Sequence, residues 1–462
     1  MNKLLYDDID TDIATILRDV DIDKDMTNYM AHDKMMHTNT LNYIITHMNI
    51  HDASNTIIIN HSINNTMGTT YSDTDNAIIT AYANKYKPLY NNIISNINHD
   101  NFIEALLNGM YVIRINQHWG NYDFTATIEN YMKMYPKMIT LLMRNLRGLY
   151  IYECTDAVLS KCESITELNI FCGTATTCEP FAKSLKKLYV DFGTESENDI
   201  TDDGLSKCTN IEVLHASGNN KITKCDAFSQ TLRELCVSWD NIYCTIDDYG
   251  IRLCRNIEKL YAHYNELITT CEPFSKTLKT LSASGLCGIS DDGLRKCIAI
   301  ECLDVSRNMK ITTCEPFART LRHLIATNRC GITNERLRIC RSIEILIVDD
   351  NDKITTCDPF AKLLRVLSVR KNICGIGDVG LRLCKNIRYM FADGNDGITS
   401  CKLFAKSLRM ISAGGSCGIC DEELKLCPNI KDVYACGNPR INMGQMDLYK
   451  MCECRSRYCR LN

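Results

Sequence analysis

The stretch ITTCEPFARTL (residues 311–321) recurs along the chain, as ITTCEPFSKTL at 268–278 and ITTCDPFAKLL at 354–364. Weaker copies end at Leu185, Leu232 and Leu408. The cysteines of this phrase are separated by 43 to 47 residues. Self-similarity at a fixed period of this size is typical of solenoids and other repeat arrays. The repeated phrase therefore predicts that the chain is built from stacked copies of one structural unit.

Each long unit contains two copies of a shorter phrase, Leu/Ile-x-x-Leu-x-Val/Ala, with apolar residues at positions 1, 4 and 6. Its spacing averages about 22 residues, and alternation of apolar and polar residues predicts a short strand in each copy. The fourteen first residues are Leu146, Ile165, Leu185, Ile211, Leu232, Ile257, Leu278, Ile300, Leu321, Ile343, Leu364, Ile387, Leu408 and Ile430.

A polar residue follows each predicted strand at a regular distance. In one half of the units it is an asparagine eight residues after the phrase begins, at Asn219, Asn265, Asn308, Asn351, Asn395 and Asn438. The other half often has a cysteine near this place, at Cys287, Cys330, Cys374 and Cys417. A buried asparagine both donates and accepts hydrogen bonds, so we expect these residues to form a ladder that satisfies backbone groups at the bends.

Residues 297–312, CIAIECLDVSRNMKIT, resemble the cysteine-containing subclass of leucine-rich repeats. The stretch GISDDGL (288–294) is similar to that family's step into the outer helix. The resemblance covers roughly residues 145–440, but alternate repeats lack the leading cysteine and use the ITTCEPF connection instead. The paired, Asn- and Ile-rich repeats are also similar to leucine-rich-repeat families of giant DNA viruses.

The resemblance implies an α/β fold, a leucine-rich-repeat solenoid with a curved parallel sheet on its concave side and short helices or loops on its convex side. All 27 cysteines lie from Cys154 onward, which indicates a domain boundary. We expect a mainly helical N-terminal region (1–140) ending in a cap, a solenoid of about fourteen repeats (141–440) and a C-terminal cap or tail (441–462). Helices are predicted at 74–86 and 99–111, and the cap at 130–146.

The repeated cysteines have three possible roles, as metal ligands, disulfide partners or packing residues. Equivalents on alternate turns lie roughly 10 Å apart if turns stack at the spacing of a sheet, too far for a disulfide or a shared metal. Packing is therefore favoured, and no cofactor or metal is predicted. In ITTCEPF, threonine can cap a helix, the acid suits its positive end, and proline is tolerated in its first turn. The phrase is thus predicted to start the outer segment, with its phenylalanine packed inward.

Composition bounds the function class. The chain is 45% hydrophobic with a net charge of −4 and has no apolar run of membrane-spanning length, and its acidic first residues lead us to expect no signal peptide. The cysteines are then expected to be reduced thiols of an intracellular protein, cytoplasmic or nuclear. The basic residues are not clustered in the way that is typical of a nucleic-acid-binding face, so nucleic-acid binding is not expected. No catalytic motif is present, so the protein is expected not to be an enzyme.

Side chains at positions 3, 5 and 7 of each strand phrase are predicted to point to the concave face, because side chains alternate along a strand, and the candidate residues are taken from positions 5 and 7. Exposed aromatic and charged residues there are typical of a binding interface. We predict a scaffold for a protein partner, with no nucleic-acid or membrane partner. The expected contact residues are Tyr189, His215, Tyr261, His263, Asp304, Ser306, Asp349, Arg370, Phe391, Asp393 and Tyr434.

An alternative is a substrate receptor of a ubiquitin ligase, because cysteine-type repeats are common behind F-box domains. Residues 4–30 faintly resemble an F-box, but they lack its Leu-Pro start and a tryptophan.

Overall fold

The computed structural model describes residues 95–97, 112–115, 140, 143–144, 146–190, 199–238 and 244–442. All of them belong to one compact unit, Ser72–Leu448, and the other unit comprises Met1–Tyr71 and Tyr449–Asn462. The helices expected at 74–86 and 99–111 and the F-box-like segment 4–30 lie outside the described residues, as does most of the tail at 441–462. Residues 140, 143 and 144, within the expected cap, are helical.

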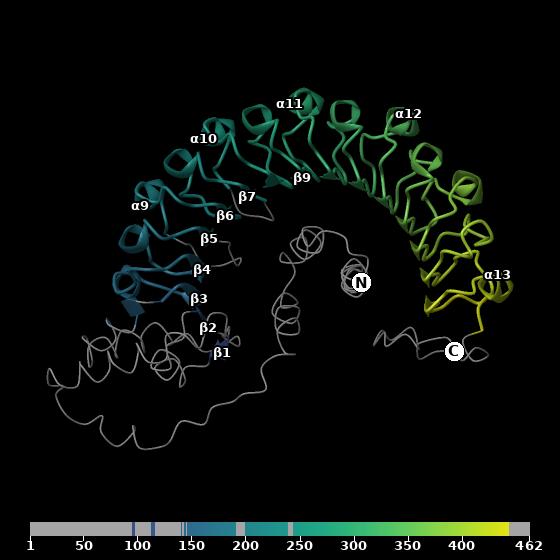
Figure 1. Cartoon of the computed structure of the whole chain (residues 1–462), viewed down its shortest axis with the longest axis horizontal. Helices are drawn as coiled ribbons and strands as arrows, with labels where there is room; N and C mark the ends of the chain where they lie inside the picture. The colour runs from purple at the N-terminus through teal and green to yellow at the C-terminus, as the bar shows by residue number, and fades with distance from the viewer. Residues whose placement is uncertain are drawn as a thin grey trace, which may run out of the picture. The chain divides into compact units, whose positions relative to one another are not determined.

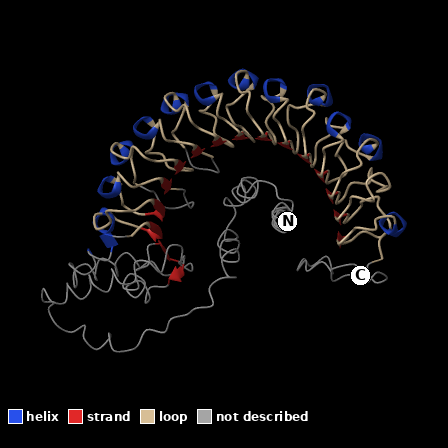
Figure 2. Cartoon of the chain, viewed as in Figure 1, coloured by secondary structure: helices blue, strands red, loops and turns tan. Residues whose placement is uncertain are grey.

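A single parallel sheet organises the described part of the chain. It has sixteen strands, and every strand pairs with its neighbours in sequence order. These turns form an arc, with the strands along its inner side and the helices on its outer side (Figures 1 and 2). The strands are β1 (Ser95–Ile97), β2 (Val112–Ile115), β3 (Gly148–Glu153), β4 (Glu167–Cys172), β5 (Lys187–Tyr189), β6 (Val213–His215), β7 (Glu234–Cys236), β8 (Lys259–Tyr261), β9 (Thr280–Ser282), β10 (Cys302–Asp304), β11 (His323–Ile325), β12 (Ile345–Ile347), β13 (Val366–Ser368), β14 (Tyr389–Phe391), β15 (Met410–Ser412) and β16 (Asp432–Tyr434).

Short helices of two kinds cover the outer side in alternation through most of the array. The α-helices, of which the last three follow Gly-Ile pairs, are α8 (Asp156–Leu159), α9 (Asp202–Leu205), α10 (Asp248–Ile251), α11 (Asp291–Leu294), α12 (Asn334–Leu337) and α13 (Asp421–Lys425). The 3-10 turns are η3 (Glu179–Phe181), η4 (Asp226–Phe228), η5 (Glu272–Phe274), η6 (Glu315–Phe317), η7 (Asp358–Phe360) and η8 (Asp378–Leu381). This architecture confirms the predicted leucine-rich-repeat solenoid.

Strands β3–β16 match the fourteen predicted phrases, and each begins two residues after the first apolar residue of its phrase. Strands β1 and β2 were not predicted, and they extend the sheet into the region before residue 141. Their sequences are too short to show a period. The open edge of β3 offers unpaired backbone groups, and pairing with that edge is a tertiary event that no local pattern records.

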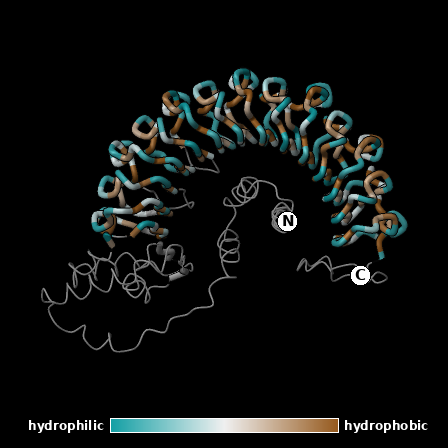
Figure 3. The backbone as a smooth tube through the Cα atoms, in the orientation of Figure 1, coloured by the Kyte–Doolittle hydropathy of each residue, from teal (hydrophilic) through white to brown (hydrophobic). Residues whose placement is uncertain are grey.

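Apolar residues at positions 1, 4 and 6 fill the interior of each turn. Leu321, Leu324 and Ala326, on either side of and within β11, are fully buried. Along each turn the backbone tube changes between brown and teal, as expected where apolar residues face inward and polar residues face out (Figure 3). Each turn thus buries its apolar face against its neighbours, which no single repeat can do alone.

The predicted asparagine ladder is present. Asn308 is buried, its Nδ2 donates to the carbonyl of Ala283 on the preceding turn (2.6 Å), and its Oδ1 accepts from the backbone N–H groups of Lys310 (2.8 Å) and Ile311 (3.2 Å). Asn351 repeats this arrangement one unit later. Each asparagine follows a residue of positive φ, such as Arg307 (φ 59°), which turns the chain out of the strand. The side chain therefore fixes both the bend and the stacking of successive turns.

The ITTCEPF connection forms the predicted start of the outer segment. The carboxylate of Asp291, in α11, accepts hydrogen bonds from the backbone N–H (2.8 Å) and hydroxyl (2.6 Å) of Thr312 on the next turn. The hydroxyl of Thr313 accepts from the N–H of Glu315, which begins η6. Phe317 ends this 3-10 turn and points into the interior, where it is buried. The GISDDGL and ITTCEPF phrases are thus two halves of one contact between turns.

The described cysteines are mostly buried free thiols, as expected. Several cysteines of the Cys-acid-Pro-Phe phrase contact a cysteine that follows an outer helix of the next turn; Cys314, for example, is hydrogen-bonded to Cys340, which lies just after α12. This contact and burial hold the pKa of Cys314 well above its ordinary value, and the same contact lowers the pKa of Cys340. Within the described ranges, no group of three or more His, Cys, Asp or Glu residues is placed to hold a metal.

Cys436 corrects the expectation of reduced thiols at one position, because it is disulfide-bonded. Its side chain is half-buried just after β16, the last described strand.

We expect the solenoid to lose stability as the pH rises above about 9. Burial raises the pKa of Cys162 and Cys287 from 9.0 to about 12, so these groups keep their protons in the folded chain and release them on unfolding. The contribution is complete below pH 9 and is lost as the pH rises toward about 12, by roughly 1 kcal/mol per pH unit for each thiol. Urea unfolding at a series of alkaline pH values, with reductant present, measures this loss. A free energy of unfolding that stays constant from about pH 9 to about pH 12 would contradict the expectation.

Candidate interaction surface

The sheet register places equivalent positions of successive strands side by side. Tyr261 in β8 pairs with Ser282 in β9, which in turn pairs with Asp304 in β10. Position 5 therefore forms one continuous row across the concave side, and position 7 forms a second row just after the strands end. Every expected contact residue lies on one of these two rows, which gives a possible partner an extended surface instead of a pocket.

The predicted exposure of this surface is wrong for several of its residues. Tyr261 is 3% exposed, His263 5% and Phe391 1%, and His215, Asp304 and Arg370 are also buried. The other five, namely Tyr189, Ser306, Asp349, Asp393 and Tyr434, are half-buried. On a sheet that curves inward, side chains of neighbouring strands converge and cover one another, and strand alternation alone does not reveal this.

Aromatic and histidine side chains interlock on the N-terminal half of the surface. The rings of Tyr189 and His215 meet edge to face, with centroids 4.7 Å apart. Nε2 of His215 lies 3.0 Å from the Glu234 carboxylate, on the next strand. Farther along, Nδ1 of His263 lies 2.8 Å from the hydroxyl of Ser238. These contacts each link side chains from neighbouring turns, so they hold the concave rows in one arrangement.

A cation, a ring and a carboxylate form a compact cluster on the C-terminal half. The guanidinium of Arg370 lies over the ring of Phe391, 4.9 Å from its centroid, and its Nε is 3.6 Å from the Asp393 carboxylate. Stacking of a cation on an aromatic face is favourable, and more so where water is excluded. Arginine and aromatic residues also predominate among residues that carry binding energy in interfaces.

Two aspartates on this half share one mode of anchoring. Asp349 accepts hydrogen bonds from the hydroxyl of Ser368 (2.6 Å) and the backbone N–H of Arg370 (2.8 Å). Asp393 accepts from Ser412 (2.7 Å) and from the N–H of Gly414 (2.7 Å) in the same way. Each carboxylate bridges to the next turn, which rigidifies the surface at positions that remain half-buried.

Position 3 also contributes to this side of the sheet, and the list of expected residues omitted it. Cys302 and His323 occupy this position in β10 and β11, and the thiol lies 3.0 Å from Nδ1 of the imidazole. Burial lowers the pKa of His323 to about 4, although nearby Glu344 acts in the opposite direction. The ring is therefore neutral at pH 7. Strand alternation applies equally to positions 3, 5 and 7, so this signal was available in the sequence.

Comparison with known proteins gives distant likenesses only. No protein-family model matches the chain, and no curated protein matches it. A solved leucine-rich-repeat protein of Leptospira interrogans has 15% identity and a TM-score of 0.43, covering 73% of this chain and all of that one. The solved complex of Rad7 and Elc1 from yeast matches at 14% identity and a TM-score of 0.37, covering 82% of this chain and 96% of that one.

The class of protein rests instead on the geometry above. A parallel sheet with one strand per repeat, an asparagine ladder and short outer helices define a leucine-rich-repeat solenoid. No helix among the described residues is long and apolar enough to cross a membrane. The similarity to giant-virus families stays a prediction.

Proposed function

We propose that the protein is a non-enzymatic scaffold that binds a protein partner on the concave face of the solenoid. The observation that carries this proposal is the pair of aligned rows at positions 5 and 7, which place aromatic, histidine and charged side chains on successive strands. In the proposal, the half-buried members contact the partner. The buried members, such as Tyr261 and Phe391, support them from below and keep the surface in a preorganised shape.

The rigidity of the surface supports this function. Its side chains are bonded from turn to turn, through Asp349 to Ser368 and through Asp393 to Ser412. A preorganised surface loses little conformational entropy when a partner binds, and the affinity is correspondingly higher. A curved sheet also surrounds a partner more completely than a flat one.

The test uses the full-length tagged protein for affinity purification from its native cells. Ser306 is half-buried at position 7 near the middle of the array, so Ser306→Arg places a bulky cation on the proposed surface. We expect it to reduce recovery of a genuine partner by about tenfold or more, as removal of good contacts at an interface centre does. The matched control is Ser206→Arg, an exposed serine that follows α9 on the convex side, which should leave recovery unchanged.

Circular dichroism establishes that both variants are folded before recovery is compared. Equal recovery with wild type, Ser306→Arg and Ser206→Arg would place the binding site elsewhere on the chain. The ubiquitin-ligase alternative stays a prediction from residues 4–30, which lie outside the described part of the chain. Recovery of the ligase adaptor that F-boxes bind would favour that alternative.

A further inference from the structure

Position 2 of the strand phrases forms a charged row along the edge where the chain enters the sheet. We call it the edge row; its members from the third phrase onward are Lys186, Glu212, Arg233, Glu258, Lys279, Glu301, Arg322, Glu344, Arg365, Arg388, Arg409 and Lys431. Consecutive members are adjacent in space, because the N–H of each donates to the carbonyl of the one before, as Arg388 does to Arg365 (2.8 Å). Each cation is followed by an acid as far as Glu344, and from Arg365 onward every member is a cation.

Opposite charges neutralise one another in the alternating part of the row. Lys186 pairs with Glu212 (2.8 Å) and Arg322 with Glu344 (3.0 Å). Glu258 contacts a cation on each side, Lys279 and Arg233, and the hydrogen bond to Lys279 is the largest cause of its lowered pKa. The cations of this part are therefore occupied by side chains of their own row.

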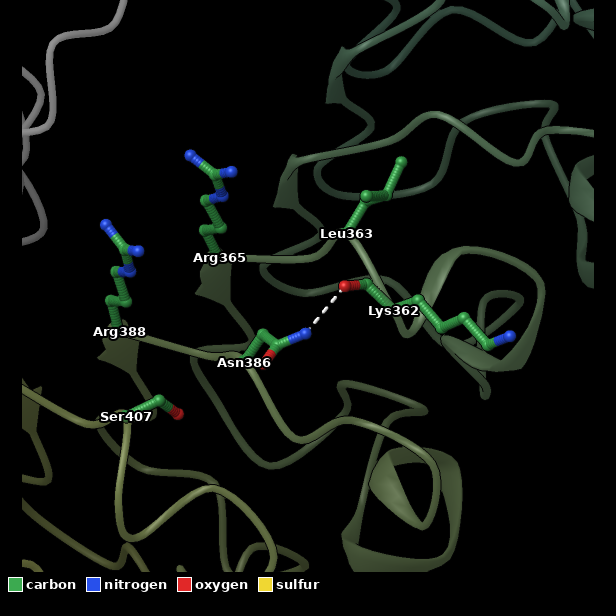
Figure 4. Close-up of a pocket in the computed structure, with 6 residues that line it drawn as sticks. All are labelled: Lys362, Leu363, Arg365, Asn386, Arg388 and Ser407. Atoms are coloured by element: carbon green, nitrogen blue, oxygen red, sulfur yellow. Dashed lines mark hydrogen bonds between the residues drawn. The ribbon is translucent and has the colours of Figure 1, made fainter.

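The last four members, Arg365, Arg388, Arg409 and Lys431, are all cations, and we call them the basic strip. Among the described residues, no carboxylate lies within ion-pair distance of any of them. Arg365 and Arg388 extend in the same direction from neighbouring strands (Figure 4). Like charges placed opposite each other on adjacent strands are destabilising, and a bound anion would relieve that repulsion. The strip thus differs from the rest of its row in having no internal counter-charge.

A recess beside the basic strip contains a residue, Leu363, that differs from its equivalents in other repeats. It is lined by Lys362, Leu363, Arg365, Asn386, Arg388 and Ser407. In most other repeats the residue before the phrase carries a hydroxyl; that of Thr320 donates to the carbonyl of Ile300 (2.8 Å) on the preceding turn. Leu363 replaces the hydroxyl with an apolar side chain that is 42% exposed. The recess therefore lies beside two guanidinium groups and one apolar side chain, whereas the Lys362 side chain points away from the arginines (Figure 4), and no acidic residue lines it.

We propose that the basic strip and this recess bind an acidic peptide segment of a partner protein. In this arrangement, the guanidinium groups of Arg365 and Arg388 hold Asp or Glu carboxylates through paired hydrogen bonds, and an apolar side chain of the peptide rests on Leu363. The strip lies at position 2, whereas the proposed concave surface lies at positions 5 and 7. The two surfaces can thus be tested separately.

The surroundings favour a peptide over a nucleic acid. No aromatic ring lines the recess to stack on a base. Glu344 lies before the strip in the edge row, and Asp432 begins β16 directly after Lys431, so acidic groups stand at both ends. A phosphate backbone running past the strip would meet both. A short acidic segment that matches the length of four strands, roughly 14 Å at sheet spacing, would meet neither.

The test measures fluorescence anisotropy of a labelled peptide of repeated Glu-Glu-Leu with the full-length protein. A peptide of repeated Gln-Gln-Leu and an oligothymidylate of the same length serve as comparison probes. We expect saturable binding of the acidic peptide that weakens as salt is raised from about 50 to about 300 mM, because exposed charges are screened. The neutral peptide should not bind.

The decisive comparison is between two double variants with the same change in net charge. Arg365→Gln with Arg388→Gln should raise Kd for the acidic peptide by about tenfold, as expected from loss of two charge-assisted contacts. Arg233→Gln with Arg322→Gln removes cations of the same row that already have partners, and should change Kd by less than about twofold. Arg365→Lys with Arg388→Lys retains the charge but loses the paired hydrogen bonds, so its Kd should lie between those of wild type and of the glutamine pair.

Thermal unfolding establishes that the variants are folded. Absence of saturable binding to wild type, equal weakening by both glutamine pairs, or tighter binding of oligothymidylate than of the acidic peptide would each overturn the proposal. None of these outcomes depends on Ser306 or on the concave face, so failure here is distinguishable from failure of the proposed scaffold function.

Discussion

Replacement of Phe317 by alanine is expected to lower the free energy of unfolding by about 3–5 kcal/mol, the usual loss for a large aromatic side chain removed from a core. Phe317 ends η6 and is 1% exposed in the interior of its turn. Its removal leaves a void that the neighbouring turns, held in place by the asparagine ladder and the sheet, can fill only in part. Because each repeat contacts only its neighbours, the damage should be local.

Urea unfolding measures the loss for Phe317→Ala, and hydrogen exchange maps it along the chain. Protection should fall most in β10, β11 and β12. The control is Ile298→Ala, since Ile298 is 61% exposed and the substitution should cost less than about 0.5 kcal/mol. Exchange that rises equally from β3 to β16 would show that the array unfolds as one unit, contrary to this expectation.

Asn308→Ala should lower the free energy of unfolding by about 2–4 kcal/mol, because several backbone groups lose their partner at once. Nδ2 of Asn308 satisfies the carbonyl of Ala283, and Oδ1 satisfies the N–H groups of Lys310 and Ile311. A buried group without a partner costs more than the net value of the bond it has lost. Asn308→Leu, which restores volume but not hydrogen bonds, should be no better than alanine.

The matched control for this prediction is Asn386→Ala. Asn386 is exposed and donates one hydrogen bond, from Nδ2 to the carbonyl of Lys362 (2.7 Å). Water replaces that bond readily, so the expected loss is about 0.5–1 kcal/mol. If the two asparagine variants lost the same stability by urea unfolding, the ladder would not have the structural role assigned to it.

Much of the fold was predictable from residue types at fixed spacing. The apolar phrase located β3–β16, since burial of one face of a strand imposes a pattern that survives in the sequence. The asparagines predicted the bends, and the ITTCEPF phrase predicted where the outer segments begin. Strands β1 and β2 were missed because the edge of an existing sheet, and not their own composition, causes them to pair. The pairing of Cys314 with Cys340 was missed for a similar reason, since it joins residues on successive turns.

For the candidate surface, too, some features follow from the local sequence and others only from the tertiary structure. Alternation along a strand is a property of the backbone, so the sequence by itself determined which residues occupy positions 5 and 7. Whether they are exposed depends on how strongly the sheet curves and on which neighbours converge, as where Arg370 covers Phe391. The edge row shows the same division, because its charges stand in the sequence about 22 residues apart. Only the stacking of turns brings Arg365 beside Arg388 and leaves the basic strip without a carboxylate, because electrostatic partners are chosen by distance in space and not along the chain.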